Sequence, residues 1–85
     1  MSISDMKLNN VYIIKELNCS DKLKSHLIGM GFIPGSNIVL LASRFGGYVI
    51  ECLGGKYALD RNMAKKIIIC EKNDYTINNN VSKYF

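Results

Sequence analysis

The 85-residue chain is long enough for one domain and too short for a second core. Its hydrophobic content of 48% and charged content of 21% favour a packed core over an extended, disordered chain. The net charge of +4 comes from scattered basic residues, which is typical of a solvated surface. No apolar run approaches the roughly 18 residues that span a bilayer, and residues 1–5 lack the features of a secretory signal. We therefore expect a cytoplasmic protein.

The three cysteines do not form a recognisable metal or disulfide motif. Cys19, Cys52 and Cys70 are odd in number and widely spaced, with no Cys-x-x-Cys pair. Free cysteine is among the most frequently buried residue types, so we interpret each of them as a small core residue. The sequence therefore predicts no metal site and no stable cofactor.

The N-terminal half predicts one strand and one short helix. A β-branched and aromatic run predicts the first strand at residues 11–14. A helix is expected over residues 21–30, because Ser20 is a good N-cap and Gly31 stands where a left-handed C-terminal cap is expected. Three apolar residues of this segment recur at helical spacing and predict its buried face: Leu23, Leu27 and Met30.

Turns rich in glycine separate the remaining strands. Pro34 and Gly35 predict a type II turn, and the pairs Gly46-Gly47 and Gly54-Gly55 predict two hairpins. Further strands are expected at residues 38–42, 48–53, 56–59 and 67–70, with a short helical turn capped by Asp60 before the last of them. Five short strands with tight turns predict a mainly β fold, a small five-stranded barrel with one short helix.

The sequence lacks the residue combinations that enzymes need. His26 is the only histidine, and its place near the apolar face of the helix predicts a partly buried side chain rather than a catalytic base. Glu51 is expected to point outward from its strand, and Asp60 is accounted for as a helix cap. The segment Gly54-Gly55-Lys56 lies between strands and has no following helix, so it is not a phosphate-binding loop. We predict no catalytic residues and no enzymatic activity.

Surplus apolar residues favour a protein-binding role. Ile38 and Leu40 occupy one face of their strand, which leaves Val39 and Leu41 on the other. On the helix, Ile28 lies beside Lys24 and away from the buried face. Exposed apolar residues rimmed by lysine are typical of protein-binding surfaces. A covering tail or loop is the alternative explanation for the same residues.

Nucleic-acid binding is the second class of function that the sequence leaves open. Small barrels bind single strands through basic residues and exposed aromatic rings. Tyr12, Tyr48 and Tyr57 lie on predicted strands, and Arg44 and Phe45 share a hairpin. Packing in the core or at the rim of the barrel is the favoured explanation for the three tyrosines. Strongly salt-dependent binding of single strands would distinguish this alternative.

Residues 27–35 resemble the signature of the ferrous iron transport protein A family, the FeoA family. The motif Leu-x-x-Met-Gly-Leu-x-Pro-Gly of that family corresponds to Leu27, Met30, Gly31, Phe32, Pro34 and Gly35. Downstream, Ile38-x-Leu40 and a spaced set also match: Gly54, Ala58, Leu59, Ala64 and Ile67. The resemblance covers about residues 6–71. This chain departs from the family at His26, where the family usually has arginine, at residues 45–47 and at Asn10.

The resemblance implies an SH3-like barrel and a role in bacterial ferrous iron uptake. We expect residues 1–5 to form an N-terminal lead, residues 6–72 the FeoA-type domain and residues 73–85 a loose tail. The implied partner is the cytosolic GTPase region of a FeoB-type ferrous iron transporter, with no nucleic acid expected and contact with the membrane only through that partner. A direct ferrous-ion carrier is a further alternative. SH3-like surfaces can pair through their strands, so the resemblance also allows a homodimer.

The predicted contact residues come from the helix, the signature turn and one strand. Lys24, Ile28, Met30 and Phe32 form the first predicted patch. Val39 and Leu41 form the second.

Overall fold

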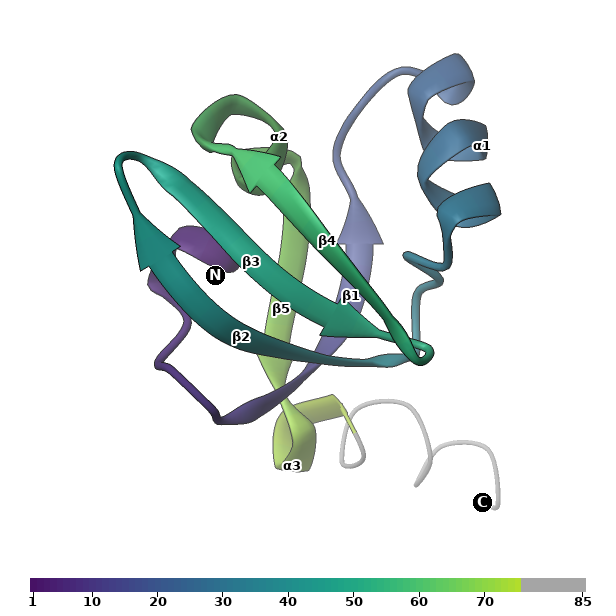
Figure 1. The fold of residues 1–85 in the computed structure, drawn as a ribbon. Helices are drawn as coiled ribbons and strands as arrows, with labels where there is room; N and C mark the ends of the chain where they lie inside the picture. Colours follow the sequence, from purple (N-terminus) through teal and green to yellow (C-terminus); the bar gives the residue numbers. More distant parts are fainter. Residues whose placement is uncertain (76–85) are drawn as a thin grey trace, which may run out of the picture.

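The computed structural model describes residues 1–75 and shows a strongly curved antiparallel sheet with short helices at its rim (Figure 1). Its five strands run in the order β4-β3-β2-β1-β5. They are β1 (Val11–Leu17), β2 (Asn37–Arg44), β3 (Gly47–Cys52), β4 (Gly55–Asp60) and β5 (Ile67–Glu71). The helical elements are η1 (Ile3–Asp5), α1 (Asp21–Met30), α2 (Arg61–Lys66) and α3 (Lys72–Tyr75). The predicted mainly β, five-stranded architecture is confirmed.

The core forms because apolar residues alternate along the strands. In β2, Ile38 and Leu40 are buried while Val39 and Leu41 are only partly covered. In β3, Ile50 and Cys52 face inward and Glu51 lies on the other face, as predicted. Eight large side chains are almost completely buried: Phe32, Ile3, Ile14, Leu27, Ile38, Ile50, Ile67 and Ile69.

The N-terminal residues, expected as a lead, lie along the outer edge of β5. Ser2 pairs with Ile68, and the Ile69 N–H donates a hydrogen bond to the Met1 carbonyl at 2.8 Å. The side chain of Ile3 is fully buried in the core. Residues 1–3 therefore cover a sheet edge whose backbone groups would otherwise be open to pairing with another chain.

Both β-hairpins turn one residue earlier than the glycine pairs predicted. The central residues are Phe45-Gly46 and Leu53-Gly54, and all four have positive φ, between 45° and 78°. Positive φ at both central positions is the type I′ geometry, which matches the twist of the flanking strands. Phe45 and Leu53 therefore carry a backbone strain of about 1–3 kcal/mol each. The second glycine of each pair begins the next strand.

The C-terminal elements follow the predicted order. Asp60 caps α2, since its carboxylate accepts a hydrogen bond from the Met63 N–H at 2.7 Å. The short helix α3 occupies the first residues after β5. Most of the expected tail, residues 76–85, lies outside the described residues. No helix within residues 1–75 is long and apolar enough to cross a membrane.

Candidate protein-binding surface

Helix α1 has the predicted bounds and the predicted caps. The Ser20 hydroxyl accepts a hydrogen bond from the Leu23 N–H at 3.3 Å. At the other end, Gly31 adopts φ 111°, and its N–H and that of Phe32 donate to the carbonyls of Ile28 and Leu27, each at 3.0 Å. This is a Schellman motif, which needs the left-handed conformation that glycine adopts without strain. The chain is thereby turned so that Phe32 enters the core.

Hydrogen bonds fix the turn that follows α1 to the sheet. The Tyr57 hydroxyl donates to the Met30 carbonyl at 2.6 Å, and the Tyr57 ring lies 5.2 Å from that of Phe32. The Gly35 N–H donates to the Ile14 carbonyl at 2.7 Å. The predicted turn at Pro34 is closed by a 2.9 Å hydrogen bond from residue 36 to residue 33. The last residue of α1 and the turn that follows it are therefore hydrogen-bonded to β4 and β1.

Exposed apolar side chains from two segments gather around Gly31. A methyl group at this glycine would lie 3.7 Å from two carbons of Leu53, so the β3–β4 turn rests against the end of α1. Leu53 is 63% exposed, and Ile28 and Ile33 are each 40% exposed. We call these three residues the α1-end patch. Lys24 is half-buried one helical turn before Ile28, on the same side of α1, and adds positive charge at the rim.

The structure places the first set of predicted contact residues at different depths. Ile28 is exposed as expected, Lys24 is half-buried, and Met30 is half-buried against the core. Phe32 has no exposed surface, so it belongs to the core and not to the accessible patch. His26 was predicted to be partly buried, and that is wrong because its side chain is exposed. Helix α1 lies at the rim of the barrel and buries only a narrow face, on which Leu27 is the one fully buried residue.

The second predicted patch lies on the outer face of the sheet. Val39 pairs with Glu51 on one side and with Val11, which is 47% exposed, on the other. Leu41 is the extra residue of a β-bulge, because the register shifts between Leu40 and Ala42. Both side chains are half-buried. This surface therefore combines apolar residues of β1 and β2 with the carboxylate of Glu51.

Two residues of the α1-end patch were missing from the sequence-based set. Leu53 sits in a two-residue hairpin turn, where a large apolar side chain is necessarily exposed. The sequence-based prediction of a strand at residues 48–53 placed Leu53 inside the strand and not in the turn, so its exposure was not expected. Ile33 precedes Pro34, which disfavours a helical conformation and leaves the side chain in an extended turn. The contact between Leu53 and the end of α1 depends on the tertiary fold and has no local signal.

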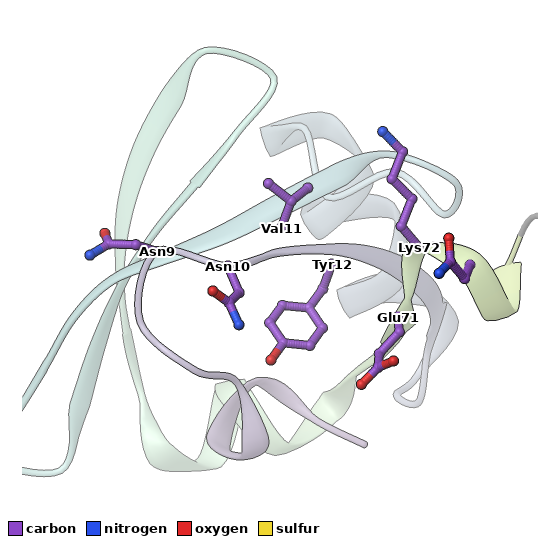
Figure 2. Close-up of a pocket in the computed structure, with 7 residues that line it drawn as sticks. Asn9, Asn10, Val11, Tyr12, Glu71 and Lys72 are labelled. Carbon is purple, nitrogen blue, oxygen red and sulfur yellow. The ribbon is translucent and has the colours of Figure 1, made fainter.

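An open pocket of about 490 Å³ lies where β1 begins and β5 ends. It is lined mainly by polar residues: Asn9, Asn10, Val11, Tyr12, Glu71, Lys72 and Asn73. Figure 2 shows Asn10, Tyr12 and Glu71 pointing to one side, with Val11 and Lys72 pointing to the other. The pocket contains one carboxylate and no histidine or cysteine. Among the described residues, no group of three metal-binding side chains comes together there or elsewhere.

The strand tyrosines pack as the favoured interpretation predicted. Tyr12 is buried, and its hydroxyl accepts a hydrogen bond from the Lys7 N–H at 3.1 Å. Tyr48 and Tyr57 are half-buried and pack against the core. None of these rings stands out from the surface as a stacking platform for bases.

Cys52 is expected to resist alkylation far better than Cys19. Burial raises the pKa of the Cys52 thiol above its ordinary value of 9.0, whereas Cys19 is only half-buried. With iodoacetamide at pH 8, we expect Cys52 to react roughly tenfold or more slowly, as measured by mass spectrometry of the peptides. Because the unfolded thiol ionises first, the stabilisation that Cys52 provides is complete below about pH 9 and is lost as the pH rises further. Equal alkylation rates would contradict its burial.

Comparisons with known proteins give one consistent result. The profile of the FeoA domain matches residues 1–70. The iron(II) transport protein A of Clostridium thermocellum has a similar structure, with a TM-score of 0.77 and 27% identity over 86% of this chain and 46% of that chain. FeoA of Chlorobium tepidum gives a TM-score of 0.75 and 19% identity over 85% and 70% of the two chains. A search of curated proteins gives no significant match.

A third similar structure is described as an SH3 domain. FeoA of Stenotrophomonas maltophilia was solved in complex with zinc and is described as an SH3-domain protein. It has a TM-score of 0.71 and 20% identity over 82% of this chain and 89% of that chain. The predicted SH3-like fold is confirmed by these neighbours. Because the profile covers most of the sequence, this chain belongs to the FeoA family of small accessory domains associated with ferrous iron transport.

Proposed function

We propose that this chain is a cytoplasmic accessory protein without catalytic activity that binds the GTPase region of a FeoB-type ferrous iron transporter. The observation that carries the proposal is the α1-end patch, in a chain of the FeoA family. Three large apolar side chains are exposed near one glycine, although every strand contributes apolar residues to the core. A cluster of this kind, with a lysine at its rim, is the pattern expected of a protein-binding surface.

The residues of the α1-end patch lie on backbone that is already ordered in the free protein. Ile28 and Ile33 flank a helix end that is capped at Gly31 and tied to the sheet by hydrogen bonds through Met30 and Gly35. Leu53 lies in a two-residue turn between paired strands. Since little backbone has to become ordered on binding, the entropic cost of association is reduced.

The two alternative functions receive less support from the geometry. A nucleic-acid-binding barrel needs several exposed aromatic platforms. Phe45 is one exposed ring, whereas Tyr12 and Tyr57 use their hydroxyls within the fold. A ferrous-ion carrier needs several ligands at one place, and the described residues offer no such group. The exposed apolar side chains of the α1-end patch support the protein-binding proposal.

The proposal is tested by an NMR titration of the isotope-labelled chain with the isolated GTPase region of its cognate transporter. The titration is run without nucleotide, with GDP and with a GTP analogue. We expect saturable changes in amide shifts in at least one nucleotide state, because an apolar patch of this kind buries surface on binding. Unchanged spectra in all three states would contradict the proposal.

A further inference from the structure

The β2–β3 turn presents an aromatic side chain that the fold does not use. Phe45 is 104% exposed, so it packs against no part of the described chain. Its backbone is also held at φ 53°, a conformation that asparagine or glycine adopts with less strain. A bulky apolar residue at such a position destabilises the isolated domain. Its presence there points to a contact outside the chain.

Basic residues lie beside this turn. The whole sequence contains two arginines, and both lie here. Arg44 precedes Phe45, and a guanidinium nitrogen of Arg61 would lie 3.9 Å from a methyl group placed at Gly46. Lys65 is exposed one helical turn after Arg61, on the same side of α2. Asp60 is the acidic residue next to Arg61, and its carboxylate caps α2.

The β3–β4 turn provides an internal comparison. It has the same backbone geometry and also carries a large apolar residue, Leu53. Leu53 rests against Gly31, whereas Phe45 packs against nothing within residues 1–75. No arginine stands beside Leu53 in the sequence. The combination of an unsupported aromatic ring with a cluster of cations is therefore particular to the β2–β3 turn.

We propose that the β2–β3 turn contacts an anionic membrane surface, with Phe45 inserted at the boundary between headgroups and acyl chains. Arg44, Arg61 and Lys65 would then face the lipid phosphates. An apolar residue surrounded by long basic side chains is the pattern of interfacial membrane anchors. One ring is too few for a nucleic-acid stacking platform. A protein interface of standard size would need several large apolar residues beside Phe45, and its immediate sequence neighbours are Arg44 and Gly46.

This inference concerns a different end of the molecule from the α1-end patch. The two turns lie at opposite ends of β3 (Figure 1), and six strand residues span roughly 20 Å. A membrane contact at Phe45 therefore leaves the α1-end patch accessible to a protein. The membrane contact is weak and reversible, because one ring and a few cations supply less binding than a lipid anchor. Its failure in an experiment would leave the proposed function intact.

Fluorescence of a Phe45→Trp variant tests the insertion, because the chain contains no tryptophan. Vesicles of equal phosphatidylcholine and phosphatidylglycerol are compared with vesicles of pure phosphatidylcholine. We expect a blue shift of the emission and quenching by brominated acyl chains with the anionic vesicles only. Leu53→Trp is the matched control at the other turn and should show neither effect. Equal responses of the two variants would overturn the proposal, as would a response to single-stranded DNA but not to vesicles.

Co-sedimentation with the same anionic vesicles tests the native side chains. Phe45→Asn should reduce the bound fraction, while Leu53→Asn should leave it unchanged; asparagine is favoured in both turns, so both variants are expected to fold. Replacing Arg44 and Arg61 with glutamine should weaken binding about fivefold for each charge removed. If Phe45→Asn sediments with the vesicles as fully as the unmodified chain, the membrane contact is contradicted. The same holds for the variant with glutamine at positions 44 and 61.

Discussion

Replacing Phe32 with alanine is expected to lower the free energy of unfolding by about 3–5 kcal/mol. The side chain has no exposed surface and lies against the ring of Tyr57, so truncation leaves a cavity in the centre of the core. Domains are stable by only about 5–15 kcal/mol, with small ones at the lower end. The variant should therefore lose most of its stability, and its Tm should fall by roughly 12 °C or more. Urea unfolding followed by circular dichroism measures the change.

Phe32→Leu is the matched control, because it keeps most of the apolar volume and should cost far less than the alanine variant. Phe32 was one of the contact residues predicted from the sequence. A loss of less than about 1 kcal/mol in Phe32→Ala would show that the site collapses easily. The assignment of Phe32 to the core rather than to a binding surface would then be wrong.

Leu53→Asp is expected to weaken binding to the GTPase region by at least about tenfold, or 1.4 kcal/mol. Leu53 is the most exposed member of the α1-end patch, and its side chain contacts the end of α1 at Gly31. A carboxylate at this position would have to be buried without a partner in an apolar interface. Aspartate tolerates the left-handed backbone of the turn, so the fold should be retained. Fitting the dissociation constant from the NMR titration gives the effect.

Phe45→Asp is the control for this prediction. Phe45, like Leu53, is the first central residue of a type I′ turn, and in both variants a large apolar side chain is replaced by a carboxylate. The two turns lie at opposite ends of β3. We expect its affinity for the isolated GTPase region to equal that of the unmodified chain. Equal losses in both variants would indicate a general electrostatic effect, and no loss in Leu53→Asp would remove the β3–β4 turn from the interface.

The local structure of this protein is strongly encoded in its sequence. Ser20 and Gly31 define both ends of α1, because a hydroxyl N-cap and a left-handed glycine satisfy backbone groups that the helix itself leaves without partners. Asp60 does the same for α2. The alternation of Ile38, Val39 and Leu40 correctly predicts which face of β2 is buried. These features depend on neighbours within a few residues, so the sequence alone reveals them.

The candidate site was predicted less completely, because it depends on contacts between distant segments. Helical periodicity places His26 near the apolar face of α1. The side chain is nevertheless exposed, because α1 packs only a narrow face against the barrel. The family motif places Phe32 beside the surface residues, although the Schellman turn directs it into the core. Leu53 joins the patch only because the β3–β4 hairpin folds against Gly31.

The location of the amide shifts in the titration with the GTPase region tests the central claim most directly. If the α1-end patch is the binding surface, the largest shifts will fall on Ile28, Gly31, Ile33 and Leu53, and the amides of the β2–β3 turn will stay unchanged. Shifts confined to residues 39–41, or the absence of any saturable shift, would contradict the account.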